Sequence, residues 1–148
     1  MIRDNKITLS VDCMGGDNSV DDIIGGVKQY CSENTNDTLL LHGDKKALSK
    51  ALNKYPEINF VGVKTGDELA KYYANADVFV FPSKTDTLGN VILEALASGT
   101  PIAAYPVTGP IDVLTDEKIN TLDNDLLQSV KKALKVKRVD CRNFTLNL

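Results

Sequence analysis

The chain has 148 residues, a length that fits one compact domain and leaves little room for a second. Apolar residues make up 43% of it and charged residues 25%, which is ordinary for a globular protein. A formal net charge of −3 argues against nucleic acid or a membrane surface as a partner. The basic run at residues 131–138 is expected to form the solvated face and C-terminal end of a helix.

Cysteine usage and hydropathy bear on the compartment. The cysteines, Cys13, Cys31 and Cys141, are odd in number and form no C-x-x-C pair, which indicates reduced thiols in the cytoplasm. No window approaches the roughly 18 consecutive apolar residues of a membrane span. We therefore expect a cytoplasmic chain with no membrane span, no metal site and no cofactor. His42 follows an apolar strand and is interpreted as an incidental loop residue, with a general base as the alternative.

Strand-like and helix-like patterns alternate along the first half of the chain. Asp17 or Ser19 can cap the first helix, and the second is expected to stop before Pro56. Six elements are predicted here: strands over residues 7–12, 38–42 and 58–63, and helices over residues 20–31, 45–54 and 67–75.

The second half continues the alternation, with strands over residues 77–81 and 102–105 and helices over residues 89–97 and 125–135. The first of these strands is nearly all apolar, as expected for a strand that is covered on both faces. The whole pattern predicts an α/β fold, in which a single Rossmann-like domain has an open parallel sheet with helices on both faces.

The loop after the first strand is a candidate anion site, because ligands of such sheets bind at the carboxyl ends of the strands. It reads DCMGGD over residues 12–17. Gly15 and Gly16 allow a tight turn that exposes amide groups to an anion. The loop lacks both the dinucleotide fingerprint and the Walker lysine. The alternative interpretation is a tight strand-to-helix turn that holds no ligand.

A second candidate site lies in the loop at residues 83–90, which leads from a buried strand into a helix. The amides of Leu88, Gly89 and Asn90 are expected to point from the helix N-terminus toward a phosphate group. Lys84 is close enough in sequence to add a positive charge.

Two acids accompany this second loop. Asp86 is a candidate for accepting hydrogen bonds from a sugar, and Glu94, two turns into the helix, is a candidate for holding a ribose diol. The alternative is that Asp86 or Thr87 merely caps the helix and that Glu94 is a surface acid. A third loop, residues 107–110, is expected mainly to end a strand and to start a helix at Ile111.

From about residue 56 onward these residues belong to a longer pattern. VGVKTGDELAKYYANADVFVFPS, TDTLGNVILEALASGTPIAAYPVTGPIDVL and CRNFTLNL resemble the nucleotide-sugar-binding C-terminal domain of GT-B retaining glycosyltransferases of group 1. The resemblance implies that Asp86 contacts the donor sugar and that Glu94 contacts the ribose. It also implies that Gly89 and Asn90 cradle the diphosphate and that Lys64 lies in the loop that frames the base.

The chain departs from this family pattern in three places. Leu88 stands where a phenylalanine is usual, and Asp86 stands where glutamate is commoner. The family's domain begins with a strand and a loop that carry Arg and Lys for the diphosphate, and no counterpart of that basic segment is recognised in the sequence.

The first part of the chain resembles a different family. ITLSVDCMGGDNSVDDIIGGVKQY and LLLHGD, within residues 7–44, are similar to the start of the phosphate acyltransferase of phospholipid synthesis. This resemblance implies that Asp12, Gly15, Gly16 and Asp17 line a phosphate-accepting loop. Only the opening β-α-β unit of that family is present.

The two resemblances meet between about residues 41 and 55. We therefore expect a chimera, natural or engineered, in which segments 1–44 and 45–148 together form one domain over residues 1–148.

The expected function is that of a donor-binding half-domain, with a nucleotide-sugar or nucleoside diphosphate as its partner. Hexosyl transfer by the chain alone is not expected, because GT-B transfer needs two domains that close over a cleft. A partner chain that supplies an acceptor domain, or a homo-oligomer, would complete it. The alternatives are a non-catalytic α/β domain without selected activity and a remnant of the phosphate acyltransferase.

Overall fold

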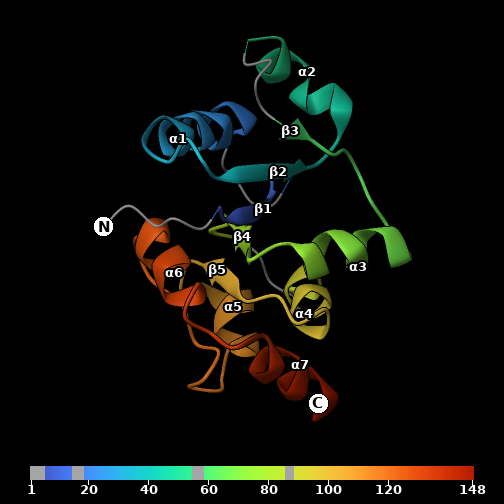
Figure 1. The fold of residues 1–148 in the computed structure, drawn as a ribbon, viewed down its shortest axis with the longest axis vertical. Coiled ribbons are helices and arrows are strands. Elements are labelled where there is room, and N and C mark those ends of the chain that lie inside the picture. The colour runs from blue at the N-terminus through green and yellow to red at the C-terminus, as the bar shows by residue number, and fades with distance from the viewer. Residues whose placement is uncertain (1–5, 15–18, 55–58, 86–88) are drawn as a thin grey trace.

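The structure is a computed structural model that describes residues 6–14, 19–54, 59–85 and 89–148 (Figure 1). Within these residues, five parallel strands form one sheet in the order β3-β2-β1-β4-β5. The strands are β1 (Thr8–Asp12), β2 (Thr38–His42), β3 (Asn59–Phe60), β4 (Val78–Phe81) and β5 (Ile102–Ala104).

Helices cover both faces of this sheet (Figure 1). On one face lie α1 (Val20–Glu33) and α6 (Leu126–Ala133), and on the other lie α3 (Gly66–Asn75) and α4 (Asn90–Ala97). The described residues also form α2 (Lys45–Lys54), α5 (Thr108–Val113) and α7 (Arg138–Leu146). The predicted Rossmann-like open parallel sheet with helices on both faces is therefore confirmed.

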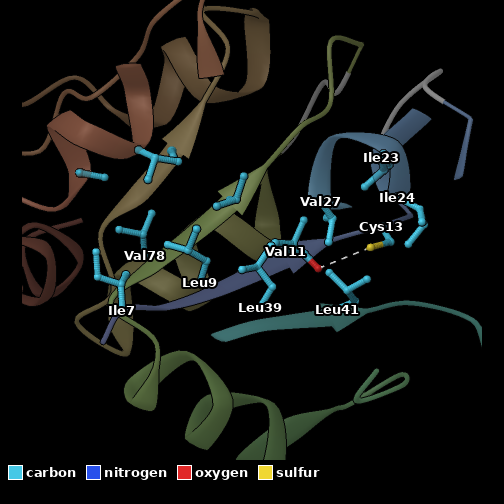
Figure 2. Packing of buried hydrophobic residues seen from close by; sticks show 14 of the residues in the cluster. Ile7, Leu9, Val11, Cys13, Ile23, Ile24, Val27, Leu39, Leu41 and Val78 are labelled. Atoms are coloured by element: carbon cyan, nitrogen blue, oxygen red, sulfur yellow. Dashed lines mark hydrogen bonds between the residues drawn. The ribbon is translucent and has the colours of Figure 1, made fainter. Parts of the chain in front are cut away.

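The core is divided by the side-chain alternation of the strands. In β4, Val78 and Val80 pack into the cluster beneath α1 and α6, whereas Phe79 and Phe81 pack into the cluster beneath α3 and α4. All four side chains are buried, as a strand covered on both faces requires. Figure 2 shows the first cluster, in which apolar side chains of α1 point at those of β1 and β2.

On the face that α3 covers, β1 and β2 carry mostly polar side chains. In β1, Leu9 and Val11 join the cluster beneath α1, so Ser10 and Asp12 are directed to the opposite face. Asp12 is in register with His42, the last residue of β2. Ser10 is fully buried, and His42 is only 8% exposed. The polar side of these two strands therefore lies under α3.

Most predicted elements are confirmed to within two residues at each end, but the third strand is shorter than predicted. Residue 58 lies outside the described residues, and β3 ends at Phe60, although Val61 still donates a backbone hydrogen bond to Leu41. Gly62 then adopts a φ of 77°, which turns the chain out of the extended conformation.

The helix after β5 begins earlier than predicted, at Thr108 instead of Ile111. Pro110 lies in its first turn. Because the first amides of a helix have no partner within the helix, a proline there costs no hydrogen bond.

Arg138, at the start of α7, is exposed as predicted for the basic run, but it also binds the end of another helix. Its guanidinium donates hydrogen bonds to the carbonyls of Ala76 at 2.6 Å and Ala74 at 2.7 Å, at the C-terminal end of α3. The exposed lysines Lys131 and Lys135 fit the prediction better. Within the described part of the chain, no helix is long and apolar enough to cross a membrane.

Candidate functional site

The strand order changes direction between β1 and β4, and we call the carboxyl ends of these two strands the crevice. These strands are neighbours, but the helices that follow them, α1 and α4, cover opposite faces of the sheet (Figure 1). Connections that diverge in this way leave an opening at the carboxyl ends of the strands, where open α/β sheets usually bind ligands. The two predicted anion loops therefore leave the sheet side by side. Several predicted site residues in them lie outside the described residues: Gly15, Gly16, Asp17, Asp86 and Leu88.

Gly89 begins α4 as its N-cap, with a left-handed backbone at φ 54° and ψ 25°. The N-cap position thus belongs to neither Asp86 nor Thr87, contrary to one of the two sequence interpretations. A Cβ atom on Gly89 would lie 3.5 Å from the Ile92 side chain, an ordinary contact, so the backbone angle and not the space favours glycine. Asn90 is the first helical residue and is exposed. The positive end of the α4 dipole therefore faces the crevice without a capping side chain on its N-cap residue.

Glu94 lies one turn beyond Asn90, on the same side of α4, and is exposed. Its charge reaches the hydroxyl of Tyr73, a buried residue of α3. Burial raises the pKa of Tyr73, and the negative charges of Glu94 and Asp12 raise it further. Two predicted site residues, Glu94 from α4 and Asp12 from β1, therefore both act electrostatically on this tyrosine.

The two lysines named from the sequence lie on either side of the crevice, each against an aromatic ring. Lys64 follows β3, and its Nζ is 2.6 Å from a carboxylate oxygen of Glu68 and 5.5 Å from the ring centroid of Tyr72. The hydrogen bond that Lys64 donates to the Glu68 carboxylate raises the pKa of Lys64. Lys84 extends the other way, with its Nζ 4.9 Å from the ring centroid of Tyr105, which follows β5.

Asp12 ends β1 and orders the start of the first loop. Its Oδ1 accepts a hydrogen bond from the amide of Met14 at 2.9 Å. The neighbouring Cys13 is buried, and this burial, together with the charge of Asp12, raises the thiol pKa to about 12. Among the described residues, no three His, Cys, Asp or Glu side chains are grouped so that they could hold a metal ion.

His42 is the residue that sequence reasoning placed least well. It is not a loop residue but the end of β2, and neither ring nitrogen has a hydrogen-bond partner. Its ring lies edge-on to Tyr72 at 5.5 Å between centroids and tilted to Tyr73 at 6.4 Å. Burial, reinforced by the positive charge of Lys64, lowers its pKa to about 4. The only feature of the sequence that could have indicated this position is that His42 ends the second predicted strand, as Asp12 ends the first.

A sequence profile of the family described as glycosyl transferases group 1 matches residues 15–136 of this chain. The chain belongs to that family. Its fold is the Rossmann-like half of a GT-B enzyme, and it matches the C-terminal half of larger group 1 glycosyltransferases.

Relatives of this group 1 domain extend well beyond the region that they share with it. A sulfoquinovosyl transferase of Arabidopsis thaliana is 42% identical over 74 residues, which cover 50% of this chain and 14% of that protein. A GDP-mannose-dependent alpha-mannosyltransferase of Mycobacterium tuberculosis is 37% identical over 84 residues, 57% of this chain and 22% of that protein.

A solved structure confirms the fold over nearly the whole chain. The pneumococcal O-GlcNAc transferase, in complex with UDP and GlcNAc, superposes with a TM-score of 0.69 at 15% identity. The superposition covers 99% of this chain and 34% of that protein.

These comparisons do not support the expected acyltransferase segment or a fusion. The family profile begins at residue 15, inside that segment, and continues through the expected junction to residue 136. In the structure, β1 is the central strand of the same sheet. The segment from β1 to the end of DCMGGD, residues 8–17, contains no Arg or Lys.

Proposed function

We propose that this domain binds the nucleoside diphosphate part of a nucleotide-sugar, as the donor-binding half of a GT-B glycosyltransferase. The observation that carries the proposal is the start of α4. Gly89 opens the helix in a left-handed conformation at the crevice between β1 and β4, and Glu94 follows one turn after Asn90. A helix N-terminus of this kind suits a diphosphate, and a carboxylate beside it suits the hydroxyls of a ribose.

The remaining roles follow from the positions of the side chains. The amides of Gly89 and Asn90 would hold the diphosphate, and Glu94 would accept hydrogen bonds from the ribose. Asp86, whose sequence position is next to this cradle, would contact the donor sugar. Lys64, on the opposite side of the crevice, would lie toward the base. The complex of a related fold with UDP supports this class of ligand.

The acceptor side of the reaction would come from elsewhere, either from another domain or from a partner chain. Hexosyl transfer requires an acceptor aligned with the donor in a site that excludes water. The described residues form only one Rossmann-like sheet, and a second copy or a second domain over its carboxyl edge would provide the other wall.

The proposal is tested by isothermal titration calorimetry with UDP, GDP and their sugar conjugates. The Glu94→Ala variant should bind the preferred nucleotide about tenfold or more weakly, because a hydrogen bond to a charged group is lost. Glu33→Ala is the matched control. Glu33 is also an exposed helical acid, but it ends α1 at the opposite edge of the sheet. A folded wild-type protein that binds none of these nucleotides would overturn the proposal and support a domain without this activity.

A further inference from the structure

His42 presents an unexplained pair of polar atoms close to the proposed donor site. The residue is only 8% exposed, and both Nδ1 and Nε2 are buried without a hydrogen-bond partner. Buried polar atoms in folded proteins are nearly always bonded, and an exception indicates a missing water, ion or ligand. An imidazole buried in this way lowers the stability of the fold, because its nitrogens lose their hydrogen bonds to water and form none within the protein.

The position of His42 in the sheet relates it to the proposed diphosphate cradle. It ends β2, in register with Asp12 at the end of β1, and β1 in turn neighbours β4, which leads to Gly89. Adjacent strands are about 4.8 Å apart, so the end of β2 lies roughly 10 Å across the carboxyl edge from the end of β4. Between the two lies Asp12, which acts with Glu94 on the Tyr73 hydroxyl. A ligand that extends from the cradle past Glu94 and Asp12 would therefore reach His42 with its far end.

The residues around His42 are of two kinds, since Tyr72 and Tyr73 contact its ring and Lys64 lies over the Tyr72 ring. Tyr73 is buried and packs edge-on to Phe79 at 5.0 Å between centroids, so it is a fixed wall. Lys64 and Tyr72 are half-buried, and Lys64 is held by an ion pair with Glu68, in which the side chains are 20% and 61% exposed respectively. Because the carboxylate partner of this pair is exposed to water, the ion pair holds the Lys64 side chain less firmly than packing holds Tyr73.

The charge state of His42 limits the chemistry that it can recognise. Because burial and Lys64 hold its pKa at about 4, the ring is neutral at physiological pH. A neutral imidazole offers one N–H donor and one nitrogen acceptor. It therefore suits the neutral polar edge of a nucleobase, whereas a phosphate would favour a cation.

We propose that His42 contacts the nucleobase of the donor nucleotide, which enters when the Lys64 side chain moves aside, and that His42 contributes to base selection. This inference rests on the proposed donor function and adds a residue to it. The other explanation of the bare nitrogens, an enclosed water molecule, predicts no response of the ring to a nucleotide.

A direct test follows from the composition, because His42 is the only histidine in the chain. Nuclear magnetic resonance of protein with 15N-labelled histidine reports the two ring nitrogens without further assignment. We expect UDP or GDP to shift one of these nitrogen signals, and inorganic pyrophosphate, which lacks a base, to leave them unchanged. Unchanged signals while the nucleotide binds, or an equal shift with pyrophosphate, would overturn the proposal.

Substitution provides the second test. His42→Phe removes both nitrogens and keeps an aromatic ring beside Tyr72 and Tyr73, and His42→Gln keeps a donor and an acceptor. We expect the phenylalanine variant to bind the nucleotide roughly tenfold more weakly with unchanged affinity for pyrophosphate, and glutamine to restore part of the loss. Equal nucleotide affinity in the wild type and His42→Phe would overturn this inference alone. A wild type that binds no nucleotide would overturn the proposed function, and this inference with it. If His42→Phe does not fold, the resonance measurement on the wild type still decides.

Discussion

Two neighbouring units of the sheet, β1 with α1 and β4 with α4, have the same topology and opposite chemistry. Every residue of β4 is apolar and buried, and its side chains fill both clusters of the core. In β1, apolar residues face α1, whereas the face toward α3 carries the buried Ser10, whose hydroxyl has no hydrogen-bond partner. The comparison teaches that β4 serves packing alone, while β1 places polar groups in the interior beside the candidate site.

The two helices begin differently as well. Ser19 caps α1, because its hydroxyl oxygen accepts a hydrogen bond from the backbone amide of Asp22 at 3.2 Å. Asp21 and Asp22 place negative charge in the first turn. The first turn of α4 has no acidic residue, and its N-cap is Gly89. Because α1 already neutralises its own dipole, we expect a phosphate to bind at α4 and not at α1.

The largest expected change in the free energy of unfolding tests the packing role of β4. Phe79 is 1% exposed and lies edge-on to Tyr73 at 5.0 Å between centroids. Phe79→Ala should lower the free energy of unfolding by about 3–5 kcal/mol, because it removes a buried ring and leaves a cavity. Ser10→Ala, the matched change in β1, should cost little or nothing, because it removes an unsatisfied hydroxyl. Urea unfolding measures both, and equal losses would contradict the contrast.

The second largest expected effect is a pH dependence of stability, which tests the buried polar side of β1 and β2. The folded pKa of His42 is about 4, below its usual value of 6.5, so between these values the unfolded chain binds a proton that the folded chain does not. Stability should therefore be complete above about pH 6.5 and fall as the pH drops toward 4, by up to about 3 kcal/mol. His42→Phe should lack this part of the pH dependence. Parallel unfolding profiles for the two proteins between pH 7 and pH 4 would contradict the prediction.

The comparison of these two units also shows which features of the fold could be predicted from the sequence. The unit of β4 and α4 was predictable because each of its signals is local: an unbroken apolar run, then a glycine, then apolar residues at helical spacing. The role of Gly89 as the N-cap was not predicted, because Asp86 and Thr87 are better capping residues by type. The roles predicted for the site residues, a ribose contact for Glu94, a phosphate loop for Asp12 and a sugar contact for Asp86, remain predictions.

The features that could not be predicted are contacts between segments that are far apart in the sequence. His42 is buried because Tyr72 and Tyr73 of α3 fold over the end of β2, about a fifth of the chain later. Arg138 belongs to a basic run that is typical of a solvated face, but the carbonyls at the end of α3 accept its hydrogen bonds. Neither contact leaves a local pattern, since both depend on how helices are placed by the sheet.

The smallest expected effect sharpens the contrast between the two helices. Gly89→Ala should lower the free energy of unfolding by about 1–2 kcal/mol, because a side chain disfavours the left-handed backbone at φ 54°. Gly25→Ala, inside α1, should instead raise it by about 0.5–1 kcal/mol, because no atom lies within 4 Å of the new methyl group and alanine favours a helix.

Nucleotide binding separates these two glycines further. Gly89→Ala should also weaken UDP or GDP binding, because a backbone that relaxes from the left-handed region redirects the amides at the start of α4. Gly25→Ala should leave it unchanged. Thermal unfolding with and without the nucleotide measures both properties in one experiment. If Gly89→Ala lost stability but kept full affinity, the left-handed turn would serve only to join β4 to α4, and the diphosphate would have to be held elsewhere along the crevice.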